Sequence, residues 1–264
     1  MNRIHPALLV AHALVIAFLA APIVVVALVS FTPSQYLSIP TTSFSLRWYE
    51  ALLHNGEFLA ALRNSGVFAL SSSVVATAIC VPAGIALGRQ KFRGSETIKS
   101  TLLSPLMVPS IVLGIAFLKF LTLIGLVGTT VGLILCHCVI ITPYVLRLAM
   151  SSAAGLDRNA ELAATSLGAT RWTVFRKVTV PLVMPGVVSG WLIGFITSFD
   201  ELTVTVFVAS PSTTTLPVKL FNHITETTDP LAASVSGVII LLAAVVMVVV
   251  DKLYGLEAMF VGKK

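Results

Sequence analysis

Charged residues are scarce in this sequence, and their scarcity excludes an ordinary water-soluble fold. Of 264 residues, 11% are charged and 56% are hydrophobic, whereas about a quarter of the residues in a soluble domain are charged. No charged residue occurs between Pro6 and Leu46. A helix that crosses a bilayer needs about 20 apolar residues, because its backbone must satisfy its own hydrogen bonds without water. We therefore expect an all-α, polytopic membrane protein.

Motifs for nucleotide binding and for metal hydrolysis are also missing. The sequence has no G-x-x-x-x-G-K-[ST] phosphate loop and no H-E-x-x-H zinc motif. We therefore expect that the chain is not an enzyme, takes no cofactor and receives its energy from another subunit. The three cysteines do not indicate a disulfide framework, and Cys136 and Cys138 point apart on a helix. We interpret His137, between them, as an interhelical hydrogen-bonding residue rather than a metal ligand.

Six apolar stretches are candidate membrane spans. They cover residues 7–29, 64–88, 100–118, about 127–146, a fifth stretch that begins near Pro181 and carries Asp200 and Glu201 in its later part, and 231–250. The first is longer than the apolar region of a secretory signal peptide, so we interpret it as a retained span. Six spans place both termini on the same side of the membrane.

The basic residues indicate which side that is. If the N-terminus lies inside, 13 of the 17 lysines and arginines fall in inner segments. The four in outer segments are Arg47, Arg63, Lys119 and Lys219. The positive-inside rule therefore places both termini in the cytoplasm. The same topology accounts for the net charge of +6, and no basic stripe with interleaved aromatics indicates a nucleic-acid partner.

Two connections are longer than the rest. In the outer segment, residues 31–63, five apolar residues are spaced to form one stripe of an amphipathic helix at the membrane interface, in contact with lipid. These residues are Leu46, Trp48, Tyr49, Leu52 and Leu53. The other long connection is the inner segment, residues 151–180.

The inner segment has the start and stop signals of two short helices. Asp157 is a plausible N-cap, residues 158–167 are good helix formers, and Gly168 stands where a left-handed residue would end the helix. Thr170 can cap a second short helix that runs through Lys177, with Trp172, Phe175 and Val178 on one face. Two such helices would form a compact knob on the cytoplasmic face; the alternative is an inner loop that merely links two spans.

The spacing within this segment resembles the signature cytoplasmic loop of permeases of binding-protein-dependent ABC importers. That loop reads E-A-A, three residues, G, nine residues, I, one residue, L-P. The corresponding residues are Leu162, Ala163, Ala164, Gly168, Val178, Val180 and Pro181. The departure is Leu162, where the family has Glu. Glu161 stands one position earlier, and one helical residue rotates a side chain by about 100°.

The resemblance implies a single MetI-like, type I permease domain over residues 1–264 in the bacterial inner membrane. In this family the loop docks in a groove of a cytoplasmic ATPase dimer. The coupling residues that the resemblance implies are Glu161, Leu162, Ala163, Ala164, Gly168, Ala169 and Pro181. It also implies a second permease subunit, forming a heterodimer, and an external substrate-binding protein.

Four further segments resemble the second permease of spermidine/putrescine-type importers. They are F-I-T-S-F-D-E-L at 195–202, T-L-P-V-K-L-F at 215–221, D-P-L-A-A-S at 229–234 and D-K-L-Y-G-L-E at 251–257. The implied cargo is a polyamine, with opines and aminophosphonates as alternatives. A secondary transporter or channel is less favoured, because no inverted repeat is detectable.

The carboxylates near the end of the fifth span are candidate substrate-path residues, because ionisable groups inside a membrane are costly and tend to face a cavity. Asp200 and Glu201 would suit a cationic amine. Trp191, Phe195 and Phe199 recur at every fourth position and could add cation–π contacts, although packing against another helix is the commoner use of such a stripe. Alternatively, the carboxylates are solvated or pair with Lys119 or Lys219.

Overall fold

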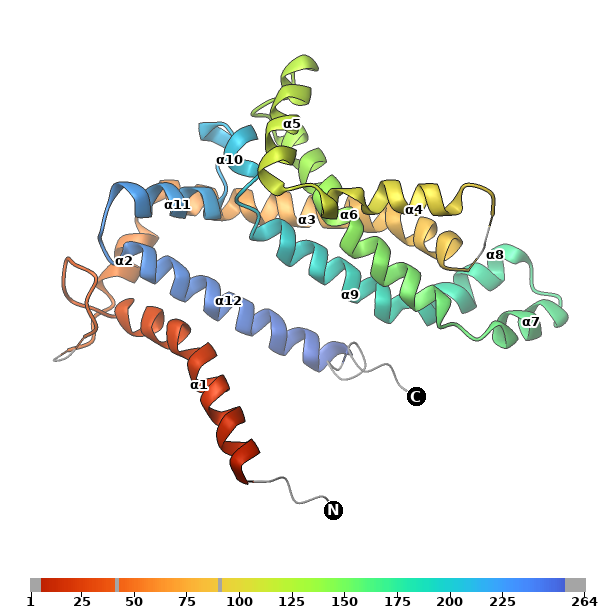
Figure 1. The fold of residues 1–264 in the computed structure, drawn as a ribbon, viewed down its shortest axis with the longest axis horizontal. Coiled ribbons are helices and arrows are strands. Elements are labelled where there is room, and N and C mark those ends of the chain that lie inside the picture. Colours follow the sequence, from red (N-terminus) through yellow and green to blue (C-terminus); the bar gives the residue numbers. More distant parts are fainter. Residues whose placement is uncertain (1–5, 41–42, 90–91, 255–264) are drawn as a thin grey trace. The chain divides into compact units, whose positions relative to one another are not determined.

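The computed structural model describes residues 6–40, 43–89 and 92–254, and every regular element within them is helical (Figure 1). This confirms the all-α fold class. The chain divides into two compact units, residues 1–60 with 219–249 and residues 61–218 with 250–264. The single domain over 1–264 stays a prediction. Arg3, Lys91, Lys263, Lys264 and the end of the D-K-L-Y-G-L-E segment lie outside the described residues.

Four helices among the described residues are long and apolar enough to cross a membrane. They are α1 (Pro6–Val29), α3 (Gly56–Arg89), α6 (Thr130–Ala154) and a 29-residue helix, Arg171–Phe199. A bent pair of helices gives a fifth candidate, and α12 (Leu231–Tyr254) occupies the place of the expected sixth. The shorter helices are α2 (Arg47–Leu53), α7 (Arg158–Ser166), α10 (Thr205–Val208), η3 (Pro211–Thr213) and α11 (Leu216–Glu226).

The third expected span is broken. It consists of α4 (Ser95–Leu103) with η1 (Ser104–Met107), followed by α5 (Ser110–Leu123), and the axis bends by 106° at the break. The prediction of one uninterrupted span over 100–118 is therefore wrong. The cause is Pro109, which disfavours helical geometry in the residue before it; Val108 is extended, with φ −91° and ψ 128°.

The fifth expected span begins earlier than the sequence predicts. It starts with α8 (Arg171–Val174), continues through the π-turn η2 (Phe175–Thr179) and becomes α9 (Val180–Phe199) without interruption. The second short helix expected to end at Lys177 is thus the beginning of the span. Pro181 does not start the helix, because the wider π-turn accommodates a residue that lacks an N–H and crowds the carbonyl of the preceding turn.

Helices α6 and α9 make the most extensive helix pairing in their unit and run side by side (Figure 1). Gly186, Gly190 and Gly194 recur at every fourth position of α9 and face α6. A Cβ added at Gly186 would lie 2.4 Å from Cβ of Ser152, and one at Gly190 would lie 3.4 Å from the carbonyl oxygen of Val145. The two backbones therefore approach closely over about two turns, as small-residue rows permit in membrane helices.

A buried chain of hydrogen bonds joins α3, α6, α9 and α10. His137 Nδ1 lies 2.7 Å from Ser198 Oγ, and its Nε2 lies 3.1 Å from Thr205 Oγ1. Ser198 Oγ in turn lies 2.9 Å from Ser72 Oγ. All four side chains are buried. This confirms the interpretation of His137 as an interhelical hydrogen-bonding residue.

In the other unit, α2 is a helix of only seven residues. The indole of Trp48 donates to the carbonyl of Ser34 at 3.0 Å, and the Tyr49 hydroxyl lies 2.8 Å from Ser30 Oγ. Leu52 is buried, whereas Leu46 and Leu53 are exposed. The five residues predicted to form one interfacial stripe therefore divide between the interior of the unit and its surface.

The loop that contains helix α7 and the end of helix α9 as candidate sites

Helix α7 has the boundaries that its local sequence predicts. The Asp157 carboxylate accepts the backbone N–H of Asn159 at 2.9 Å, as an N-cap does. At the other end Gly168 has φ +85°, in the left-handed region that costs a residue with a side chain about 1–2 kcal/mol. Thr170 then caps the next helix by accepting the N–H of Thr173. The chain thus turns sharply between α7 and the long helix.

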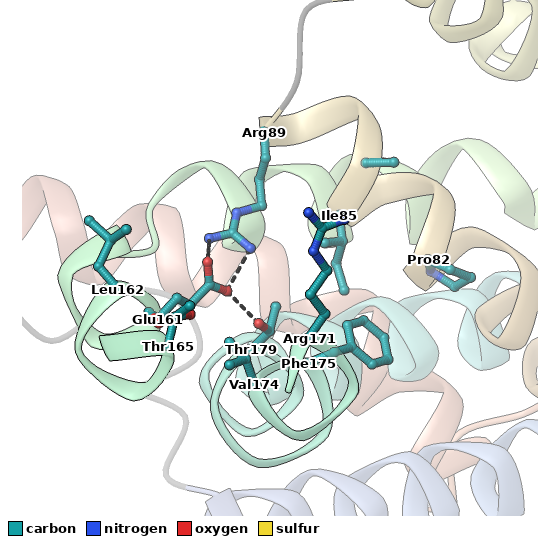
Figure 2. A pocket seen from close by; sticks show the side chains of 11 residues that line it. Pro82, Ile85, Arg89, Glu161, Leu162, Thr165, Arg171, Val174, Phe175 and Thr179 are labelled. Atoms are coloured by element: carbon teal, nitrogen blue, oxygen red, sulfur yellow. Dashed lines mark hydrogen bonds and ion pairs between the residues drawn. The ribbon is translucent and has the colours of Figure 1, made fainter. Parts of the chain in front are cut away.

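Glu161 lies on the face of α7 that points into the protein, as Figure 2 shows. Its two carboxylate oxygens accept from both terminal nitrogens of Arg89, at 2.8 and 2.7 Å. The Thr179 hydroxyl also donates to this carboxylate. The side chains of Arg89 and Glu161 are 14% and 21% exposed, so the bidentate pair is largely shielded from water and geometrically fixed.

These residues border a cavity of about 570 Å³. Its walls come from the last turns of α3, from α7 and from the first turns of the Arg171–Phe199 helix (Figure 2). The lining residues include Ile85, Thr165, Arg171 and Phe175. The loop is therefore not a plain linker, since it lines an open pocket together with the ends of two long helices.

The outer face of the loop presents apolar side chains to the outside, and one of them, Leu162, also lines the cavity. Leu162 is 62% exposed, Leu167 is 89% exposed and Trp172 is 67% exposed. Ala163 and Gly168 are exposed beside them. Trp172 stacks on Phe175 with ring centroids 5.7 Å apart, as expected for residues that share a face. The structure thus distinguishes neighbouring members of the predicted coupling set: the carboxylate of Glu161 is bound inside the protein, whereas Leu162 is largely exposed although it lines the same cavity.

The remaining members of the predicted coupling set lie apart from that outer face. Ala164 and Ala169 are half-buried. Pro181 lies within the continuous helix, beyond the π-turn. Sequence reasoning missed Arg89 and Thr179, and nothing in their local sequence indicates that either would meet Glu161.

Asp200 and Glu201 follow directly on the end of α9. Helix α9 ends at Phe199, and Asp200 is the C-cap, so neither carboxylate lies within the span as predicted. The Asp200 side chain is exposed, and it has no hydrogen-bond or ion-pair partner among the described residues. Lys219, one of the suggested partners, pairs with Glu57. Asp200 is therefore a solvent-accessible negative charge at the helix end.

Glu201 points into a second cavity, of about 140 Å³, beside the break between η1 and α5. The cavity is also lined by Ser110, Tyr144 and Thr197. One carboxylate oxygen of Glu201 accepts the backbone N–H of Val204 at 2.7 Å. Burial raises the pKa of the Glu201 carboxyl above its ordinary value, and this backbone hydrogen bond opposes that effect.

The aromatic stripe forms as predicted. The rings of Trp191 and Phe195 lie 5.9 Å apart and those of Phe195 and Phe199 lie 6.1 Å apart. None of the three lines the cavity that holds Glu201. Phe199 is the last residue of the stripe and of α9, and Asp200 follows it in the chain.

A family model described as the binding-protein-dependent transport system inner membrane component matches residues 80–256. This match covers more than half of the chain and includes both candidate sites. The chain belongs to this family. It is therefore a membrane-spanning permease subunit of an ABC importer, in which separate subunits hydrolyse ATP.

Relatives and solved structures agree with this assignment. The permease is 32% identical over 237 residues to the spermidine/putrescine transport system permease protein PotC of Escherichia coli K12, covering 90% of this chain and 89% of PotC. It is 33% identical over 220 residues to the putrescine transport system permease protein PotI of the same strain, covering 81% and 78%.

The fold also matches a chain of a bacterial ABC transporter involved in the import of the acidic polysaccharide alginate. The TM-score is 0.73 at 16% sequence identity, over 94% of this chain and 95% of that one. This likeness shows a shared fold.

Proposed function

We propose that this permease carries a polyamine, such as spermidine or putrescine, across the bacterial inner membrane. An external binding protein delivers the cargo, a second, different permease subunit completes the pathway, and a cytoplasmic ATPase dimer drives it. The names of PotC and PotI support the cargo. The distribution of basic residues supports the orientation, with both termini in the cytoplasm.

The observation that carries the proposal is the pair of adjacent carboxylates at the end of α9. The two side chains lie in different surroundings, because Asp200 is exposed and Glu201 lines a cavity. A polyamine has several ammonium groups separated by methylene chains, so it can meet two carboxylates and slide along an aromatic stripe through cation–π contacts. Trp191, Phe195 and Phe199 supply such a stripe. An opine or an aminophosphonate carries acid groups as well, which two carboxylates would repel.

The outer face of the loop is the proposed docking surface for the ATPase. Exposed Leu162, Leu167 and Trp172 offer apolar side chains, and the small side chain of Ala163 permits close approach. Arg176 and Lys177 follow on the same segment and are exposed, so they can meet acidic groups at the rim of a groove. In this arrangement Leu162 contributes an apolar contact where the family has a glutamate.

The test is ATP hydrolysis by the complete transporter in lipid, with its binding protein present. Spermidine, putrescine and a neutral amino acid are compared at equal concentration. Stimulation by a polyamine and not by the amino acid is the expected result. Stimulation by the amino acid alone would refute the cargo and leave the family assignment intact.

The carboxylates are tested in the same complex by uptake of radiolabelled spermidine. Asp200→Asn removes a charge without breaking any hydrogen bond among the described residues, so we expect uptake to fall by about fivefold or more while the complex still assembles. Glu201→Gln is expected to act similarly. Glu50→Gln, at an exposed glutamate of α2, is the matched control and should leave uptake unchanged. Normal uptake by Asp200→Asn would remove Asp200 from the pathway.

A further inference from the structure

One carboxylate joins the cytoplasmic loop to two long helices. Glu161 belongs to α7, Arg89 is the last residue of α3, and Thr179 ends the π-turn η2 of the Arg171–Phe199 helix. The guanidinium and the hydroxyl both reach the carboxylate of Glu161 (Figure 2). The sequence separation of Arg89 and Glu161 is 72 residues and that of Thr179 and Glu161 is 18. The contact is therefore tertiary and does not follow from the local winding of α7.

The chemistry of the three groups fixes the geometry of this contact. A guanidinium at the C-terminal end of α3 lies where the helix dipole favours a positive charge. Two parallel N–H···O bonds fix the angle between guanidinium and carboxylate as well as their distance, which a lysine at position 89 would not do. Thr179 is 3% exposed, so its hydroxyl is held against the carboxylate by the packing of the helix around it.

The position of Glu161 distinguishes it from its neighbour Leu162. Leu162 lines the same cavity but is 62% exposed, so a partner can touch it, whereas both oxygens of Glu161 already accept hydrogen bonds inside the protein. An ATPase residue that bound Glu161 would have to share a carboxylate whose two oxygens already accept from Arg89 and Thr179. Glu161 is therefore suited to hold α7 to the membrane helices rather than to the ATPase.

We propose that Arg89, Glu161 and Thr179 form a clasp through which a displacement of α7 moves α3 and the Arg171–Phe199 helix together. This inference rests on the proposed docking of the loop on the ATPase. Without the clasp, α7 remains attached through its two connections, residues 155–157 and 167–170, and through the packing beside η2. Those connections would then flex when ATP drives the loop, and the displacement of α7 would not move α3.

The test compares single variants with an exchange of the two charges in the complete transporter. The single variants are Glu161→Gln, Arg89→Gln and Thr179→Val; the exchange combines Arg89→Glu with Glu161→Arg. The control is Glu96→Gln, which removes one carboxylate of the ion pair between Glu96 and Lys99 on α4. Three quantities are measured: co-purification of the ATPase subunit, ATP hydrolysis with spermidine and binding protein, and spermidine uptake per ATP hydrolysed.

We expect the ATPase subunit to remain bound and hydrolysis to continue in each single variant. Uptake per ATP should fall at least about fivefold in Glu161→Gln and Arg89→Gln, and less in Thr179→Val, which keeps the ion pair. The exchange should recover a substantial part of the loss, and Glu96→Gln should behave as wild type. Loss of the ATPase subunit in Glu161→Gln but not in Arg89→Gln would identify Glu161 as a docking residue and overturn the clasp.

Hydrogen–deuterium exchange provides a readout that needs no cargo. Amides of α7 should exchange faster in Arg89→Gln, although the substitution lies outside α7, and to the same extent as in Glu161→Gln. Unchanged exchange in Arg89→Gln would refute the clasp. A wild-type complex that fails to respond to spermidine would instead refute the proposed cargo, while the exchange experiment would still decide on the clasp.

Discussion

Replacing Gly186 with alanine is expected to destabilise the pairing of α6 with α9. The added Cβ would lie 2.4 Å from Cβ of Ser152 and 2.7 Å from its Oγ, about one ångström closer than ordinary contact. The Cβ of Ser152 cannot rotate away, so the two helices must move apart along the glycine row. Relief is available only by losing close contacts over several turns.

The magnitude follows from two opposing terms. Overpacking in a closely packed interior costs about 1–3 kcal/mol, and alanine gains back about 0.8–1 kcal/mol over glycine in a helix. The net loss for Gly186→Ala is therefore up to about 2 kcal/mol, with a middle value of about 1 kcal/mol. Gly190→Ala is the matched control on the same helix face. Its Cβ would meet nothing closer than 3.4 Å, so this variant should be as stable as wild type or slightly more stable.

The assay is the thermal unfolding midpoint of the purified transporter in detergent, followed by intrinsic fluorescence. We expect a lower midpoint for Gly186→Ala only. Adding Ser152→Gly removes both of the nearest atoms and should restore part of the loss, giving a coupling free energy of about 1 kcal/mol between the two sites. Equal midpoints for Gly186→Ala and Gly190→Ala would refute the close approach of the two backbones.

Three further substitutions test local features. His137→Ala leaves the buried hydroxyl of Thr205 without its partner and opens a cavity, so the unfolding free energy should fall by about 2–4 kcal/mol; an unchanged thermal midpoint would contradict the hydrogen-bonded chain. Asp157→Ala removes the cap of α7 at a cost of about 1 kcal/mol, and faster amide exchange at residues 158–161 is the expected sign. Gly168→Ala strains a backbone at φ +85° by about 1–2 kcal/mol, so exchange should rise on both sides of the bend. Amide exchange at the wild-type rate in Asp157→Ala would contradict the cap, and the same result in Gly168→Ala would contradict the left-handed bend.

Features that depend on neighbouring residues were predictable from the sequence. Except for the broken third stretch, the predicted apolar stretches coincide with long helices, because apolar composition and length are local properties. Asp157, Gly168 and Thr170 have the predicted roles, since caps are formed by residues within three or four positions of the helix end. The aromatic stripe of α9 follows from helical periodicity alone.

Other features depend on contacts between distant segments or on unusual winding. Pro105 and Pro109 are visible signals of the broken third span, but a count of apolar residues does not register them. Pro181 suggested a helix start, because proline is favoured in the first turn of a helix. The π-turn before it could not be foreseen from the sequence. The motif places Glu161 in the predicted coupling set but gives no sign of its partner Arg89, which lies 72 residues away in the sequence.

The glycine row of α9 was also overlooked, although its signal is present in the sequence. Gly186, Gly190 and Gly194 follow the small-residue spacing that is typical of close helix packing in membranes. The pattern indicates that a partner helix exists and leaves its identity open. Only the fold shows that the partner is α6 and that Ser152 meets Gly186 most closely.

The π-turn η2 gives the long helix a means of rotation that requires no hinge. Its hydrogen bonds close one residue later than those of an α-helix, so the turn stores one surplus residue between the loop and the membrane half of the helix. Rewinding that turn to regular α geometry would twist the two halves against each other by about 100°. The backbone would stay helical throughout. A change of winding at Phe175–Thr179 would therefore rotate the glycine row about the helix axis relative to the loop.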